Sequence, residues 1–298
     1  MAQLPAQAQA FMPHWIFSPQ SDSLSVVWFR KMVILERPLQ QAKLMVATNG
    51  KVRAYVCEAN VGRGIYYPAR QPGDNRAVAL TWDVTPYLRP DTIVVAIAYC
   101  PTGHETDNRQ VAACLYGTDA DGKPFSLFSD ETWLCRPANT RLTADGHEIT
   151  DGRAHNTIWN STNPASALWT GCNQVTASDM HAPAIIDYST ALPAEAVAHT
   201  RRSNYFDAEG DTVQYEFGTA FHGMVRITLR EAKRGEVVNY DDNIYICSGD
   251  MDEQACPLFT TSTHRRVTVT GQDGFHRDHI VNIEALETTE KSMDNTLE

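Results

Sequence analysis

The stretch Phe217-Gly218-Thr219-Ala220-Phe221-His222, which continues as Gly223-Met224-Val225-Arg226-Ile227, decides the fold class of this chain. Apolar and polar residues alternate on both sides of a glycine, which predicts a strand, a glycine turn and a second strand. Successive side chains of a strand point to opposite faces of a sheet. The phrase therefore predicts strands with one buried face and one solvated face.

The same alternation recurs in both halves of the sequence. It is present at Val111–Leu115 and at Val281–Ala285, whereas Ile93–Cys100 is unbroken apolar, as in a strand covered on both faces. Polar turns separate these segments, and Thr118–Pro124 predicts a hairpin loop. Only Pro193–Arg202 has a helical composition, and it suits an extended connector equally well. We predict an all-β chain made of two antiparallel, jelly-roll-like β-sandwich domains.

The length of the chain fits two domains of ordinary size. It has 298 residues, of which 43% are hydrophobic and 20% charged, so it is globular in composition. Periodicity weakens between Arg136 and Tyr205, where Asn, Thr, Pro and Gly accumulate. We predict domains over residues 1–145 and 146–298, with their junction somewhere between 136 and 205.

Charge and cysteine content indicate which classes of partner and which cellular compartment suit this chain. The formal charge of −11 argues against a nucleic-acid partner, and no apolar run is long enough to predict a membrane span. The odd number of cysteines, seven, at wide spacings predicts buried free thiols. No signal peptide is visible at Met1–Ala10, which favours the cytoplasm. A chain trimmed at its start would look the same and would allow a periplasmic or secreted location.

Several short phrases in the first half resemble the N-terminal domain of bacterial α-L-rhamnosidase-like glycoside hydrolases. They are Phe29-Arg30-Lys31, Ala54-Tyr55-Val56, Val61-Gly62-Arg63-Gly64, Trp82–Pro90 and Ser129–Trp133. In that family the domain is a jelly roll related to galactose-binding modules. The opening phrase and His264–Val269 resemble the next β-domain of the same enzymes. The resemblance runs from about Trp15 to Glu287.

The resemblance implies a role without catalysis. The family's general acid and base lie in a helical barrel after these β-domains, and only eleven residues follow Glu287 (298 − 287). No catalytic residue can be carried over. We expect a carbohydrate-binding or accessory module that contacts a rhamnose-containing glycan or a catalytic partner subunit. The alternatives are an active α-L-rhamnosidase-type glycoside hydrolase and a protein–protein interaction module, including a homo-oligomer.

Aromatic residues beside polar ones are the candidates for sugar binding. A sugar ring lays its C–H face on an aromatic ring, while its hydroxyl groups need hydrogen-bonding side chains. Two clusters fit this requirement: Arg63, Tyr66, Tyr67 and Arg70 in the first, and Trp159, Asn160 and Trp169 in the second. The alternative is that these aromatic residues fill the ends of a sandwich or the seam between domains.

Other constellations have simpler explanations. Glycoside hydrolysis needs two carboxyl groups, and the loop acids that could supply them are more typical of solvated loops: Asp241, Asp242, Asp250, Asp252 and Glu253. The sequence Asp119-x-Asp121-Gly122 predicts a hairpin turn rather than a calcium loop. On a strand, His276 and His279 would point to opposite faces. We therefore expect neither a metal nor a cofactor.

Overall fold

The computed structural model describes residues 15–62, 64–68, 77–102, 110–155, 158–163, 168–175, 186–187, 195–199, 204–209, 212–272 and 274–289. The chain forms two compact units. Unit 1 contains Met1–Ala138, Thr157–Pro193 and Ser292–Glu298, and unit 2 contains Asn139–Asn156 and Ala194–Lys291. Three of the points at which the chain passes between the units therefore fall in the range 136–205. That residues 1–145 and 146–298 are separate domains stays a prediction.

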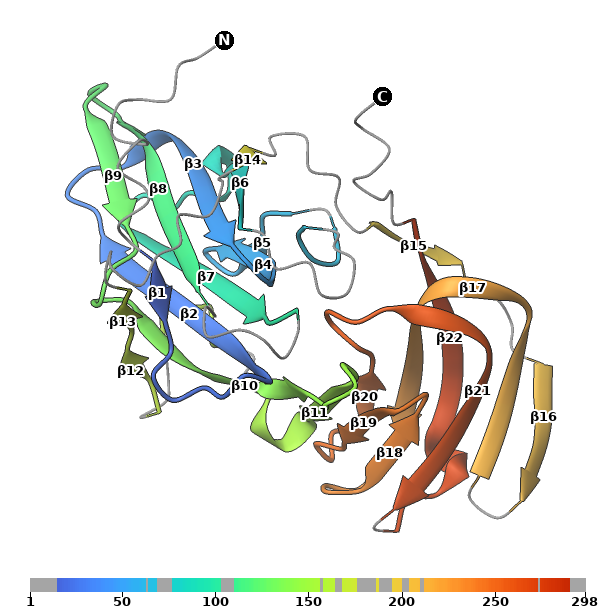
Figure 1. The fold of residues 1–298 in the computed structure, drawn as a ribbon. Coiled ribbons are helices and arrows are strands. Elements are labelled where there is room, and N and C mark those ends of the chain that lie inside the picture. Colours follow the sequence, from blue (N-terminus) through green and yellow to red (C-terminus); the bar gives the residue numbers. More distant parts are fainter. Residues whose placement is uncertain are drawn as a thin grey trace. The chain divides into compact units, whose positions relative to one another are not determined.

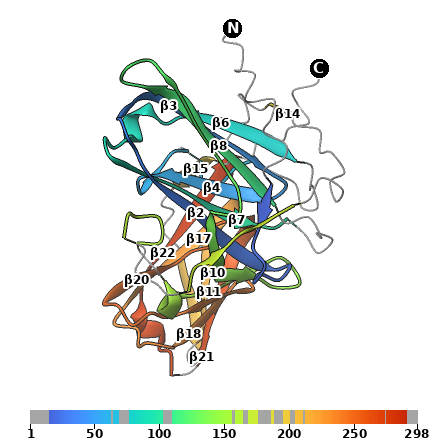
Figure 2. The same cartoon turned by 90° about the vertical axis from the view of Figure 1, so that its left-hand side faces the viewer.

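Unit 1 contains two sheets. The first has the strand order β13 (Asn173–Gln174), β1 (Ile16–Phe17), β8 (Val111–Asp119), β3 (Leu39–Thr48), β6 (Val78–Asp83) and β14 (Ile186–Asp187), with β9 (Pro124–Phe128) beside β8. The second has the order β10 (Leu134–Leu142, which belongs to unit 1 as far as Ala138), β2 (Ser25–Ile34), β7 (Thr92–Cys100), β4 (Lys51–Val56) and β5 (Ala59–Asn60), with β12 (Thr170–Gly171) beside β10. Figures 1 and 2 show β8, β3 and β6 in one layer and β2, β7 and β4 in another.

The core of unit 1 fills the space between these sheets. Leu44 and Leu115 from the first sheet and Ile93, Val95 and Ile97 from the second are all buried in one apolar cluster. All residues of β7 after its first are buried. The prediction of a strand covered on both faces is thus confirmed, and so is the β-sandwich class.

The predicted hairpin at Thr118–Pro124 is confirmed. Strands β8 and β9 pair antiparallel, with Thr118 opposite Pro124. The Asp119 carboxylate accepts the backbone N–H groups of Asp121 and Lys123 at 2.9 and 2.8 Å, and Gly122 has φ +77°. Asp119 thus closes the turn through its side chain.

Unit 2 is built around one long strand. β17 (Thr212–Arg230) pairs with β21 (Ser262–Gln272) and β22 (Ile280–Thr289), and also with β16 (Asn204–Glu209) and β20 (Asp252–Ala255). The sheet continues from β21 to β18 (Val237–Tyr240), β19 (Asn243–Ile246) and β11 (Glu148–Asp151), while β15 (Glu195–His199) lies beside β22. β11 pairs with β19 in parallel, as β14 does with β6 in unit 1, whereas the pairs of β17 with its four neighbours are antiparallel.

The predicted glycine turn at Gly218 is wrong. β17 continues through this position as one strand, drawn as an arched ribbon in Figure 1, and residues on both sides of it pair with β21, with a register shift between Glu216 and Phe221. Gly218 has φ +76° in this irregular stretch. The glycine therefore permits a bulge, beyond which β22 takes the place of β16 as the neighbour of β17 on the side opposite β21.

Two smaller predictions can also be compared with the structure. Within Pro193–Arg202 the described residues form strand β15, so the extended alternative is correct for that part. All seven cysteines are free thiols, and all except the half-buried Cys256 are buried, as predicted. In the described part of the chain, no helix has the length and apolar character that crossing a membrane requires.

Candidate functional site

The second sheet of unit 1 carries large side chains on the face opposite the sandwich core. On β2, Trp28 and Arg30 occupy this face, where they lie opposite Ala98 and Ala96 of β7. Tyr55 of β4 is the neighbour of Ala96 on its other side. The two alanines leave room above the central strand, so the longer side chains on both sides can meet there.

A chain segment distant in sequence covers this face. The Trp159 ring stacks on Trp28 with ring centres 5.0 Å apart and an interplanar angle of 9°. It also meets the Tyr55 ring edge-on at 5.3 Å. Trp159 is only 8% exposed, so its ring packs inside unit 1 and contributes little to the surface.

Arg30 binds the same segment through its guanidinium. Its Nη1 and Nη2 atoms donate to the backbone carbonyls of Trp159 and Ser161 at 3.0 and 2.6 Å. The side chain is 1% exposed, and this burial lowers the pKa of Arg30. A buried cation is thus neutralised by carbonyl dipoles and fixes the covering segment.

Trp169 lies between two guanidinium groups. The Arg30 and Arg136 Cζ atoms are 5.5 and 5.8 Å from its ring centre. Trp169 is only half-buried, although its indole Nε1 is shielded from solvent and has no hydrogen-bond partner among the described residues. This ring is the predicted aromatic residue with the most accessible surface.

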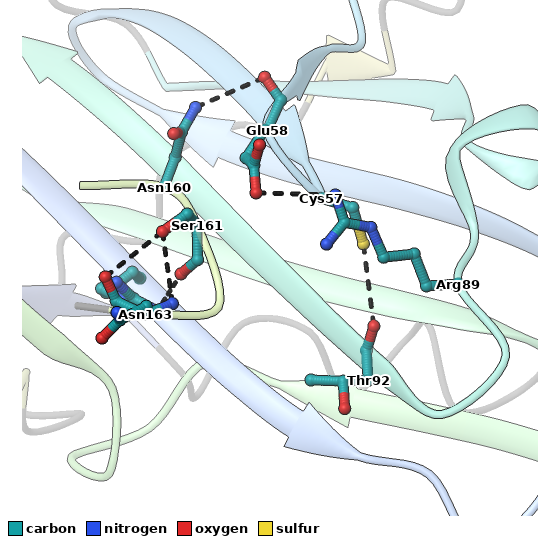
Figure 3. A network of polar contacts seen from close by, with 8 residues as sticks. Cys57, Glu58, Arg89, Thr92, Asn160, Ser161 and Asn163 are labelled. Atoms are coloured by element: carbon teal, nitrogen blue, oxygen red, sulfur yellow. Dashed lines mark hydrogen bonds and ion pairs between the residues drawn. The ribbon is translucent and has the colours of Figure 1, made fainter. Parts of the chain in front are cut away.

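Figure 3 shows the polar contacts of the covering segment. The Asn160 side-chain amide donates to the Glu58 backbone carbonyl at 3.4 Å, and the Ser161 hydroxyl exchanges hydrogen bonds with the backbone of Asn163. The Glu58 carboxylate lies 3.5 Å from Arg89. Asn160 is buried, so its amide holds the segment to the loop after β4.

The two tyrosines of the first predicted cluster are buried elsewhere in unit 1. Tyr66 is 0% exposed, with the Lys51 ammonium 4.3 Å from its ring centre. The Tyr67 hydroxyl accepts the Gly64 N–H at 2.9 Å, and its ring meets Trp82 edge-on. This burial favours the packing alternative. Arg63 and Arg70 lie outside the described residues.

The structure therefore brings together Trp159, Asn160 and Trp169, as the second predicted cluster. It adds four residues that were not among the candidates for sugar binding: Trp28, Arg30, Tyr55 and Arg136. The available signal was a tryptophan and an arginine at alternate positions of a largely apolar strand. That any of these residues binds sugar stays a prediction.

The predicted solvated acids of unit 2 have structural contacts. Glu253 is buried, so that prediction is wrong for this residue. Its carboxylate accepts the Tyr245 hydroxyl at 2.9 Å and the Ser248 and Gly249 N–H groups at 2.7 and 3.2 Å. Burial and this contact raise the pKa of Tyr245. Asp252 forms an exposed ion pair with Arg230 at 2.8 Å.

The histidines differ from the strand prediction. His276 precedes a single 3-10 turn and His279 is the last residue of that turn, with ring centres 6.4 Å apart, so the two do not point to opposite faces of a strand. His264, buried on β21, contacts the Asp241 carboxylate. Among the described residues no group of three or more potential metal ligands is found.

Comparison with solved structures shows where this fold occurs. The chain is similar to α-L-rhamnosidases from Dictyoglumus thermophilum (TM-score 0.76, 20% identity), Aspergillus terreus (0.72, 19%) and Streptomyces avermitilis (0.75, 20%), the last complexed with L-rhamnose. The matches cover 94%, 92% and 89% of this chain but 36%, 36% and 28% of those chains.

The chain thus has the fold of part of an α-L-rhamnosidase. The predicted resemblance is confirmed at the level of fold, and the chain spans about a third of the length of these proteins. No protein-family model and no curated protein match the sequence.

Proposed function

We propose that this chain is a non-catalytic accessory module of an α-L-rhamnosidase-like glycoside hydrolase, in which it binds carbohydrate or supports a catalytic partner. The observation that carries the proposal is the fold shared with 28–36% of three α-L-rhamnosidases over nearly the whole of this chain. One of these proteins was solved with L-rhamnose, which makes that sugar the first ligand to test.

The covered face of unit 1 is where we place the sugar. The half-buried Trp169 offers a ring for the apolar C–H face of a pyranose, and the Arg136 guanidinium beside it can donate to hydroxyl groups. Arg30 and Trp159 are buried and act behind this ring, because they fix the segment that carries Asn160 and Ser161. Rigid support of this kind lowers the entropic cost of binding.

Calorimetric titration of the whole chain with L-rhamnose and rhamnose-bearing oligosaccharides tests the proposal. We expect binding heat at millimolar sugar, lost in Trp169→Ala and kept in Trp82→Ala, which removes another half-buried tryptophan of unit 1. Absence of heat with the wild-type protein would contradict sugar binding. Release of nitrophenol from 4-nitrophenyl α-L-rhamnoside would contradict the non-catalytic assignment.

A second candidate function, docking of a protein partner, is favoured by exposed apolar residues on β2. Met32 and Ile34 are 43% and 75% exposed and follow Arg30 at the strand's two-residue period. Large apolar side chains at a strand end are typical of contact surfaces. Light scattering of the wild-type chain and of Ile34→Ser tests this function: self-association lost in the variant supports it, and a strict monomer that binds sugar favours the first candidate.

A further inference from the structure

Unit 2 contains a cavity that the unit 1 site does not involve. It has a volume of about 450 Å³ and lies where β17 ends and β22 begins. Arg230 and Lys233 line it from one turn, and His276, Asp278 and His279 from the other. A volume of several hundred Å³ is sufficient for one monosaccharide.

A buried carboxylate holds the imidazole of His279 in place. Glu236 is 2% exposed, and its Oε2 lies 3.1 Å from His279 Nδ1. Both atoms are shielded from solvent, their contact is not aligned as a hydrogen bond, and neither has another hydrogen-bond partner among the described residues. Two lone pairs facing each other in a buried place would repel, so Nδ1 carries the proton. The edge of Phe275 packs against the same ring, with ring centres 5.8 Å apart.

The orientation of His279 leaves its other nitrogen for a ligand. With a proton on Nδ1, Nε2 accepts a hydrogen bond in the neutral ring and donates one in the imidazolium, and a sugar hydroxyl can partner either form. Because Nδ1 faces the protein interior, the part of the ring that lines the cavity includes the opposite edge. Glu236 thus acts as a positioning residue.

The charges of the lining balance each other. Two cations, Arg230 and Lys233, stand with two carboxylates, Glu231 and Asp278. Arg230 also pairs with Asp252 outside the lining, and Asp278 lies 4.0 Å from Arg277. An ion of either sign would meet repulsion as well as attraction in this cavity, whereas a neutral polar molecule would meet only donors and acceptors.

The lining also fits the surface of a sugar. Each hydroxyl group both donates and accepts, and ammonium, carboxylate and imidazole groups supply both kinds of partner. Val281, 47% exposed, adds an apolar patch for ring C–H groups. We propose that this cavity is a second carbohydrate site, which binds a neutral monosaccharide through Lys233, His276 and His279, with Glu236 fixing the His279 imidazole.

Nuclear magnetic resonance of the histidine rings tests this site separately from the unit 1 face. We expect millimolar L-rhamnose to shift the His276 and His279 signals in both the wild-type chain and Trp169→Ala. D-Glucuronate and D-glucosamine, which are similar in size but charged, should do so only at higher concentration. Unchanged histidine signals would overturn the inference, even if the Trp169 signals respond. A response to either charged sugar at lower concentration would overturn the preference for a neutral ligand.

Two variants extend the test. His279→Ala is expected to weaken this binding at least tenfold, whereas His147→Ala, which removes a half-exposed histidine of unit 2, should leave it unchanged. In Glu236→Gln the ¹⁵N signals should report loss of the Nδ1–H tautomer of His279 together with weaker binding. A wild-type ring protonated at Nε2 instead would contradict the role of Glu236, and this readout does not depend on the stability of the variant.

Discussion

Each unit contains a buried charged side chain that holds a loop against a sheet, a cation in unit 1 and an anion in unit 2. Arg30 in unit 1 and Glu148 in unit 2 are each 1% exposed, and each is neutralised chiefly by backbone dipoles. The Glu148 carboxylate accepts the N–H groups of Leu258, Phe259 and Thr260 at 2.7–3.1 Å and the Thr260 hydroxyl at 2.9 Å. Arg30 donates to two carbonyl groups and faces the Trp169 ring.

The difference lies in how fully each charge is satisfied. The donors around Glu148 come from one continuous stretch, Leu258–Thr260: Oε1 accepts four hydrogen bonds and Oε2 shares the Leu258 N–H, so this contact is a structural one. Among the described residues, the Arg30 guanidinium, which has five N–H donors, donates to two carbonyl groups, and the neighbouring indole Nε1 of Trp169 has no hydrogen-bond partner there. Hydrogen-bonding groups without a described partner distinguish the candidate binding region from the structural contact at Glu148.

The largest effect should follow from removing the Glu148 carboxylate. Glu148→Ala leaves the N–H of buried Phe259 and two half-buried N–H groups without their acceptor, which should lower the free energy of unfolding by about 2–4 kcal/mol. Glu148→Gln, which keeps one acceptor oxygen, should lose less. Urea unfolding measures both, with Glu131→Ala as the exposed control. Equal losses in Glu148→Ala and in the control would contradict the comparison.

Arg30→Met should have the next largest effect. It keeps an apolar stem but leaves the carbonyls of Trp159 and Ser161 unpaired, so the free energy of unfolding should fall by about 1–3 kcal/mol. Loosening of the covering segment should also increase tryptophan exposure, visible as a red shift of fluorescence. Arg89→Met, at an exposed ion pair, is the control, and a similar red shift there would refute the role of Arg30.

A third test concerns the thiol of Cys135, which is buried and whose charged form has few hydrogen-bond donors around it. The hydrogen bond from the Cys172 thiol is the main cause that lowers the pKa of Cys135 to about 7, whereas the pKa of Cys172 is raised. Between pH 7 and the ordinary thiol pKa of 9, the unfolded chain binds more protons at Cys135 than the folded chain does. The free energy of unfolding should therefore increase as pH rises from 7 to 9, and this gain is lost as pH falls through 7.

Thiolate absorbance at 240 nm measures this titration. In Cys172→Ala the step near pH 7 should move upward toward the ordinary thiol range. Cys114→Ala should leave the step unchanged, because burial raises the pKa of Cys114 to about 12. A wild-type chain without a step below pH 8 would contradict the shift.

The smallest effect should come from Asp119, whose carboxylate also accepts backbone N–H groups but lies in an exposed turn. Water can replace this carboxylate as the acceptor of the two N–H groups. Asp119→Ala should therefore lower the free energy of unfolding by only about 0.5–1 kcal/mol. A loss as large as that of Glu148→Ala would show that burial is not the deciding factor.

Local patterns predicted local structure. Alternation predicted the strands, the apolar run Ile93–Cys100 predicted coverage on both faces, and Asp119 with Gly122 predicted a hairpin. The same reasoning failed at Gly218, because a glycine with positive φ permits a bulge as readily as a turn, and only the partners of β17 distinguish them. Burial of Glu253 depends likewise on folding of its own loop around the carboxylate.

The candidate site could be predicted only in part. Trp159, Asn160 and Trp169 were recognisable as an aromatic and polar cluster, but Arg30 donates to a carbonyl 129 positions away in the sequence. The pairing of Trp28 with Trp159 also depends on the alanines of β7, which make space for it. Such long-range fits are decided by packing and leave no period in the sequence.

The most direct test of sugar binding at unit 1 follows the six tryptophan indole N–H signals during titration with L-rhamnose. We predict that the Trp169 signal shifts progressively at millimolar sugar, while those of Trp15 and Trp133, both buried, stay in place. An unmoved Trp169 signal at saturating sugar would contradict the account.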